Sequence, residues 1–183
     1  MPTRARERLM STAEELFYAE GIRAVGIERI LEVSGVGRAS FYRHFPGKDD
    51  LVVEILRHRD SAWRRWLADS VAAIGAPAEQ RPLAVFAALA ERFGRRDFRG
   101  CAFINTMVEA ADVDSPAHLV AVEHKQKVSA YLDELLAEAG RTDHAALAEA
   151  FILLIDGAIV TALREGTPDA AWRARTIAAA LLS

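Results

Sequence analysis

Side chains that can bind phosphates and base edges cluster between residues 36 and 48. This segment contains Arg38, Arg43 and Lys48 but no Asp or Glu, although the whole chain has a net charge of −3. A guanidinium group can donate two hydrogen bonds to a guanine, and cationic side chains contact the phosphate backbone. The chemistry of this segment therefore favours contact with a nucleic acid.

Two short helices joined by a tight turn are predicted to position these side chains. Apolar residues recur on one helical face between residues 27 and 34, which predicts the first helix. Gly35 can adopt the left-handed conformation that ends a helix. We expect Val36, between two glycines, to fill the space between the two helices.

The second helix is predicted over residues 38–45, before Pro46-Gly47 breaks it. Phe41 and Phe45 share one face and are expected to lie in the core, which leaves the polar side chains facing outward. Two short helices, a glycine in the turn and a polar second helix are typical of a helix-turn-helix, whose second helix enters the major groove of DNA.

At this point the sequence resembles the TetR family of transcriptional repressors, over about residues 4–55. The residues that carry the resemblance are Gly35, Val36, Phe41, Tyr42, His44, Phe45, Lys48 and Leu51. The resemblance implies a helix-turn-helix in residues 1–48 and a helical ligand-binding and dimerisation domain in residues 49–183.

The resemblance and the polar pattern together give the expected DNA-binding residues. They are Arg38, Ala39, Ser40, Tyr42, Arg43, His44 and Lys48. Lys48 opposes the helix dipole at the start of the next helix, so we expect an external anion such as a phosphate beside it.

Two positions differ from the family pattern. Val25-Gly26 stands where the family commonly has Thr or Ser pairs, and Gly37 stands where it commonly has Ser. These differences are the only support for an alternative function, a small-molecule-binding helical dimer that no longer binds DNA.

The composition predicts an all-α protein of about nine helices, because Ala and Leu are abundant and Gly and Pro are confined to a few junctions. Besides the two helices above, the expected ranges are 3–20, 48–73, 81–93, 100–111, 116–139, 143–165 and 168–182. Cys101 is the single cysteine, which fits a reducing cytoplasm and excludes an intrachain disulfide.

Other functional classes find no support in the sequence. It contains no glycine-rich phosphate loop and no Gly-x-Ser-x-Gly motif, so no enzyme is expected. The histidines do not have the spacing of a zinc site, and no cofactor is expected. No uninterrupted run of 18 apolar residues is present, so no membrane span is expected.

An effector site is expected in the second domain, where apolar and aromatic residues are accompanied by a few polar groups. The residues expected to bind a small-molecule effector are Trp63, Trp66, Phe86, Phe103, Asn105 and Met107. Each of these side chains has an alternative role as an ordinary core residue.

The centre of the helix expected over residues 143–165, from Phe151 to Leu163, is apolar on nearly every side and therefore needs a cover on every side. We expect a second subunit to supply it, with 143–165 and 168–182 forming a four-helix bundle with their symmetry mates, as the family resemblance implies. Asp156 lies within this apolar helix and needs a partner for its carboxylate. A double-stranded DNA operator of palindromic sequence follows from a twofold dimer.

Overall fold

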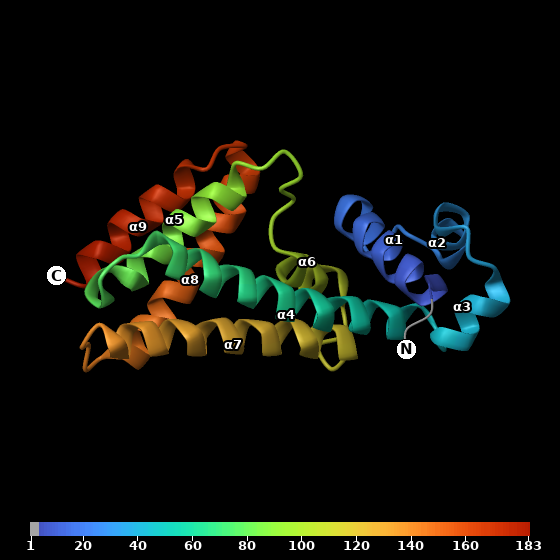
Figure 1. Cartoon of the computed structure of the whole chain (residues 1–183), viewed down its shortest axis with the longest axis horizontal. Coiled ribbons are helices and arrows are strands. Elements are labelled where there is room, and N and C mark those ends of the chain that lie inside the picture. The colour runs from blue at the N-terminus through green and yellow to red at the C-terminus, as the bar shows by residue number, and fades with distance from the viewer. Residues whose placement is uncertain (1–3) are drawn as a thin grey trace. The chain divides into compact units, whose positions relative to one another are not determined.

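The computed structural model describes residues 4–183, and every regular element in that range is helical. Nine α-helices and one 3-10 helix follow each other along this part of the chain (Figure 1). They are α1 (Arg4–Glu20), α2 (Ile27–Ser34), α3 (Arg38–His44), α4 (Lys48–Ile74), η1 (Ala78–Gln80), α5 (Arg81–Phe93), α6 (Ala102–Glu109), α7 (Pro116–Glu138), α8 (His144–Glu165) and α9 (Asp169–Leu181). The all-α prediction is confirmed, and the expected start of the first helix at Thr3 lies outside the described residues.

The chain divides into two compact units. The first consists of the chain up to Asp60 together with Ala102–Val122. The second consists of Ser61–Cys101 together with Glu123–Ser183. Helices α4 and α7 therefore contribute residues to both units. The functional division between residues 48 and 49 remains a prediction.

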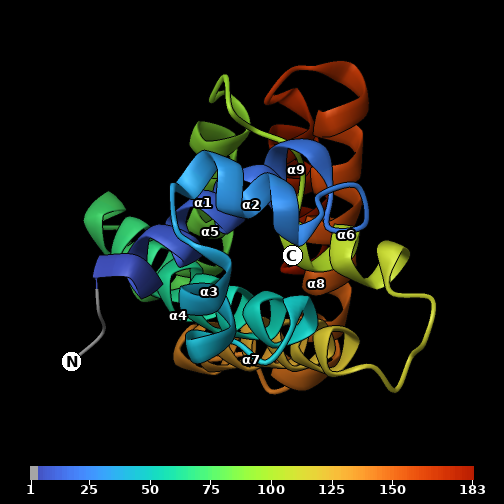
Figure 2. The same cartoon turned by 90° about the vertical axis from the view of Figure 1, so that its right-hand side faces the viewer.

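The first unit is built around α1, with α2 and α3 packed against it (Figures 1 and 2). Its core contains apolar residues from α1, α2, α3 and α4, because each of these helices carries its apolar residues at helical spacing. The fully buried side chains include Leu9, Ile30, Phe41 and Leu51. This core fixes α3 without using the polar side chains of that helix.

The second unit contains α5, α8 and α9, which pack against one another. Helix α5 is rich in alanine, a small residue with high helix propensity, and buries most of its length. Phe86 of α5 and Phe151 of α8 lie in contact, with ring centroids 5.6 Å apart. Phe86 thus has a structural role in holding α5 against α8.

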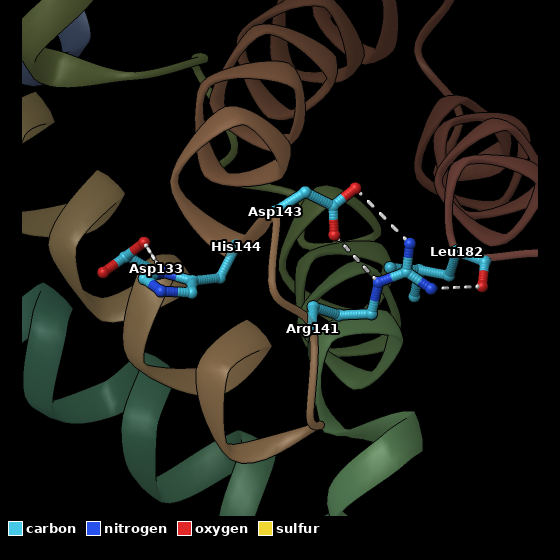
Figure 3. A network of polar contacts seen from close by, with 5 residues as sticks. All are labelled: Asp133, Arg141, Asp143, His144 and Leu182. Atoms are coloured by element: carbon cyan, nitrogen blue, oxygen red, sulfur yellow. Dashed lines mark hydrogen bonds and ion pairs between the residues drawn. The ribbon is translucent and has the colours of Figure 1, made fainter.

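Polar contacts close the turn between α7 and α8 (Figure 3). Arg141 donates from Nε to the carboxylate of Asp143 at 3.2 Å and from Nη1 to the carbonyl of Leu182 at 3.0 Å. Asp133 of α7 and His144 of α8 form a second contact. The hydrogen bond from Arg141 lowers the pKa of Asp143. These contacts tie the turn to the end of α9.

Two local features differ from the sequence-based expectations. Helix α6 begins at Ala102, not at residue 100, because Gly100 has a φ of +79° that a right-handed helix does not accept. The short helix η1 was not predicted, since Pro77 and a few polar residues give no periodic pattern. Both differences lie in connections between the main helices.

Candidate nucleic-acid interface

The turn between α2 and α3 depends on a left-handed glycine. Gly35 has a φ of +63° and donates its N–H to the carbonyl of Leu31 at 3.0 Å, which ends α2. The backbone N–H of Val36 then donates to the hydroxyl of Ser34, and the side chain of Val36 is buried. The expected roles of Gly35 and Val36 are confirmed.

One face of α3 anchors the helix in the core. Phe41 and Phe45 are buried, with ring centroids 5.9 Å apart. The guanidinium of Arg6 lies over the ring of Phe45, 5.5 Å from its centroid, and also pairs with Glu54 of α4. Arg6 therefore stabilises the packing of α1, α3 and α4.

The opposite face of α3 presents the side chains expected to read DNA. Ala39, Tyr42 and Arg43 are exposed, whereas Ser40 and His44 are half-buried. Tyr42 is 48% exposed, although it is an aromatic residue, and its ring meets Phe41 edge to face at 5.2 Å. The aromatic ring of Tyr42 and the guanidinium of Arg43 are thus both exposed on α3.

Arg38, the first residue of α3, forms an ion pair with Glu28 in the first turn of α2. Glu28 was not among the residues expected from the sequence, because the two residues are ten positions apart and meet only when the turn folds. Gly37, just before Arg38, supplies no side-chain cap to α3.

Lys48 begins α4 and is half-buried. Its ammonium lies over the ring of Phe17 of α1, 5.9 Å from the centroid. An external anion was expected beside Lys48, and this aromatic neighbour was not. The Phe17 contact limits the directions that the ammonium can take.

A carboxylate from α6 supports the connection between α1 and α2. The Oε2 atom of Glu109 accepts a hydrogen bond from the backbone N–H of Arg23 at 2.7 Å. Gly21, which ends α1 with a φ of +94°, would bring a Cβ within 3.3 Å of the same oxygen. The left-handed conformation therefore favours a glycine there, and a Cβ would also have to displace the Glu109 carboxylate slightly.

Cavities in the first unit are small. One of about 30 Å³ is lined by Tyr18, Ile55 and Asn105 among others, which is room for one or two water molecules. A second of about 260 Å³ is lined by residues that include Arg23, Lys48 and Glu109. The cavity beside Asn105 is too small for a typical effector in this arrangement.

Three of the expected effector residues lie in the second unit. Trp63 and Trp66 are partly exposed, and their ring centroids are 5.8 Å apart. His124 meets Trp63 edge to face at 5.2 Å, and Arg92 lies over the ring of Trp66 at 4.9 Å. Phe86 is fully buried against α8. The two tryptophans are therefore the accessible members of this group.

The other three lie on α6, in the first unit. Phe103 is buried, while Asn105 and Met107 are half-buried. The six residues thus belong to two compact units, and each group is described by itself.

An open groove in the second unit was missed by the sequence analysis. It has a volume of about 700 Å³ and is lined by Ser61, Arg64 and Arg65 of α4 and by Lys127, Tyr131 and Glu134 of α7, among others. None of the expected effector residues lines it.

Helices α8 and α9 expose large apolar side chains. They are Leu153, Val160 and Leu163 of α8 and Trp172, Ile177 and Leu181 of α9. The Asp156 carboxylate on α8 pairs with Lys125 of α7, which supplies the partner that a half-buried carboxylate needs. The remaining apolar side is an exposed patch of the kind that marks an interaction surface.

By length and average composition, α8 is also apolar enough to cross a membrane, with a mean hydropathy of 2.0. The sequence-based expectation differed because Asp156 interrupts the run of apolar residues without lowering the average below this level. The core helix of a soluble protein has the same average, so one such helix is weak evidence for a membrane span. Within residues 4–183 no group of three or more His, Cys, Asp or Glu side chains is arranged to hold a metal ion.

Comparisons with known proteins place this geometry in a family. The model of the bacterial regulatory proteins of the tetR family matches residues 9–55. The transcriptional regulator AcuR of Cereibacter sphaeroides is 33% identical over 174 residues, which cover 90% of this chain and 79% of AcuR. The regulator LmrA of Bacillus subtilis is 36% identical over 76 residues, and that alignment spans only 40% of LmrA.

Solved structures agree with this assignment. The crystal structure of a TetR-family transcriptional regulator from Streptomyces coelicolor is 34% identical, with a TM-score of 0.90 over 100% of this chain and 90% of that one. Such relatives are transcriptional regulators and not enzymes. The chain belongs to the TetR family of bacterial transcriptional regulators, with an N-terminal helix-turn-helix that binds DNA.

Proposed function

We propose that this regulator is a repressor that binds a palindromic DNA operator as a homodimer and is released by a small apolar or amphipathic effector. The observation that carries the proposal is the outer face of α3, where Tyr42 and Arg43 are exposed and no acidic residue occurs. A surface of this kind attracts the phosphate backbone and reaches the base edges. The repressor would act in the cytoplasm.

The proposed contacts divide into two kinds. Arg38 and Arg43 read base edges, since a guanidinium that bonds a guanine through two N–H groups discriminates against other bases by about 1–3 kcal/mol. Ser40, Tyr42 and His44 contact the backbone or bases, Ala39 allows close approach, and Lys48 contacts a phosphate. Support comes from the exposure of Arg38, Ala39, Tyr42 and Arg43 and from the half-buried positions of Ser40, His44 and Lys48 beside them.

The proposed dimer forms through α8 and α9. The exposed apolar residues of both helices, with Leu153 74% exposed, lose contact with water when a second copy covers them. Gly157 is exposed on the same helix, and no atom lies within 4 Å of a Cβ placed there, which permits close helix approach. Two copies would set their α3 helices about 34 Å apart, one turn of DNA.

The proposed effector contacts aromatic residues of the helical domain. The expected set is Trp63, Trp66, Phe86, Phe103, Asn105 and Met107, and the partial exposure of the two tryptophans supports it best. An effector that binds one arrangement of the helices better than the other shifts the DNA affinity by the coupling free energy, typically about 1–3 kcal/mol. This coupling would release the operator.

Selection of genomic DNA fragments tests the proposal. The purified protein is mixed with fragmented genomic DNA at moderate salt, and the retained fragments are sequenced. We expect one enriched palindrome with half-sites about one helical turn apart, because a twofold dimer presents two reading helices. A double variant, Tyr42→Ala with Arg43→Ala, is the control and should retain no enriched sequence.

Two results would overturn the proposal. Equal retention of all fragments by the original protein and the double variant would show that α3 does not read DNA. Absence of retention at every salt concentration would favour the alternative, a small-molecule-binding dimer without DNA binding, which the lack of side-chain caps at Gly26 and Gly37 supports. A reporter gene placed behind the recovered palindrome then separates repression from activation.

A further inference from the structure

The ion pair between Glu28 and Arg38 joins the two helices of the reading unit at their outer side. Glu28 lies in the first turn of α2, and Arg38 is the first residue of α3. Both side chains remain largely exposed, 71% for Glu28 and 58% for Arg38, so the pair contributes little to folding stability. The pair is therefore not needed for folding and can serve a separate role at the DNA surface.

The geometry of the guanidinium allows Arg38 to hold Glu28 and a base at the same time. Nη2 of Arg38 donates to Oε1 of Glu28. A guanidinium has five N–H donors in a rigid plane, and the contact with Glu28 uses one of the two on Nη2, so the second N–H of Nη2 and a neighbouring N–H still form a free edge with two parallel donors. The O6 and N7 atoms of guanine take two such donors.

Pairing with Glu28 restricts the rotation of a long, exposed side chain before DNA arrives. An unrestrained arginine loses its rotamer freedom when it binds a base, and restraint in advance reduces that loss. The same carboxylate repels phosphates and therefore weakens binding to DNA of any sequence. Both effects raise the ratio of specific to non-specific affinity.

We propose that Glu28 is a positioning residue that holds Arg38 for guanine recognition and so sets the sequence specificity of the regulator. The inference rests on the proposed function, because it concerns how α3 reads an operator. Glu28 itself touches no base in this account. It acts through Arg38, and each operator half-site carries a G·C pair opposite Arg38.

The experiment compares two variants with the same change of charge. Glu28→Gln removes the carboxylate that pairs across the turn. Glu32→Gln is the matched control, because Glu32 is equally exposed on α2 and pairs within that helix, with Arg29 at 3.1 Å. Dissociation constants are measured for the selected operator and for shuffled DNA of equal length, at one salt concentration.

For Glu28→Gln we expect the ratio of operator to shuffled affinity to fall about two- to fivefold, because the restraint from an exposed ion pair is worth at most about 1 kcal/mol. For Glu32→Gln both affinities should rise together and leave the ratio unchanged. Replacing the G·C pair opposite Arg38 should lower the operator affinity of the original protein. The same replacement should lower the affinity of Glu28→Gln by a smaller factor.

A third variant tests whether Glu28 acts through Arg38. In the Arg38→Ala background, Glu28→Gln should produce no further fall in the ratio, since the contact is already lost. A further fall there, or an equal fall for Glu28→Gln and Glu32→Gln, would overturn the assignment of Glu28. A regulator that prefers no DNA sequence at all would instead overturn the proposed function, and this inference with it.

Discussion

The outer face of α3 and the outer faces of α8 and α9 are both exposed, but their chemistry is opposite. The α3 face combines Tyr42 with Arg43 and lacks acidic residues. The α8 face presents Leu153, which is 74% exposed, together with Val160 and Leu163. One chain thus exposes a polar, cationic surface and an apolar surface on different helices.

The difference indicates two kinds of partner. Contacts with phosphates release counterions, so binding through α3 should weaken steeply as salt concentration rises. Burial of apolar side chains is insensitive to charge screening and is strengthened by salts such as sulfate. We therefore expect a rise in salt concentration to release DNA and to leave the dimer intact.

The largest expected effect comes from placing a charge on the apolar surface. Leu153→Glu puts a carboxylate where a second copy would cover it, and an unpaired buried charge is strongly unfavourable. We expect a monomer, measured by sedimentation, and a loss of operator affinity of about 100-fold or more, because two linked heads bind far better than one.

Val108→Glu is the matched control for this change. Val108 lies on α6 and is 80% exposed, so the same substitution occurs on a similarly accessible apolar residue that belongs to neither α8 nor α9. The control should remain dimeric. If Leu153→Glu stays a dimer with full affinity, or if both variants dissociate, the apolar surface of α8 is not the dimer interface.

A smaller effect is expected from single changes on the DNA surface. Tyr42→Ala and Lys48→Ala should each weaken operator binding about tenfold while the dimer persists, the cost of one contact to a base or phosphate. For Lys48→Ala, the slope of log affinity against log salt concentration should also become shallower by about one, because one fewer counterion is released on binding. Titration of labelled operator at several salt concentrations measures both quantities.

Lys127→Ala provides the control for Lys48, because it removes a lysine from α7 in the second unit, where it pairs with Glu123. Its salt dependence should equal that of the original protein. Unchanged affinity for both Tyr42→Ala and Lys48→Ala would show that the reading surface has been assigned to the wrong residues.

A change in folding stability is expected from the connection between α1 and α2, which supports the helix-turn-helix. Gly21→Ala forces a side chain into a left-handed backbone with a φ of +94°, close to the Glu109 carboxylate. We expect a loss of about 1–2 kcal/mol in the free energy of unfolding, measured with urea. In the double variant with Glu109→Ala, the loss of stability that comes from crowding against the carboxylate should disappear. The loss that comes from the left-handed backbone should remain.

Gly47→Ala is a suitable comparison, since Gly47 has no positive φ and its nearest neighbour is a side-chain oxygen at 3.5 Å. Its stability should change by less than that of Gly21→Ala. Equal stability of both variants would mean that the α1–α2 connection adapts and does not hold the reading helices.

Helices were predictable because their signals are local. The helix boundaries of α2 and α5 follow from apolar spacing and from the residues that end them, so both ranges agree with the structure. The burial of Phe41 and Phe45 was predictable for the same reason, since residues four apart share a face. Family resemblance added the identity of the unit, which spacing alone does not give.

Contacts between elements were not predictable from one sequence. The pairing of Glu28 with Arg38, the placement of Lys48 over Phe17, and the bond from Arg23 to Glu109 each join residues on different elements. Their distances depend on how helices pack, and no local periodicity encodes that arrangement. These contacts around the DNA-binding residues could therefore be identified only from the structure.

The most direct test of the central claim is a hydroxyl-radical footprint of the protein on its selected operator, combined with the mass of the complex. Two copies reading one palindrome should protect two symmetric segments centred about 34 Å apart on the same face of the duplex. The complex should contain two chains, and Leu153→Glu should abolish the paired protection. A single protected segment with one chain bound, unchanged by Leu153→Glu, would contradict the account.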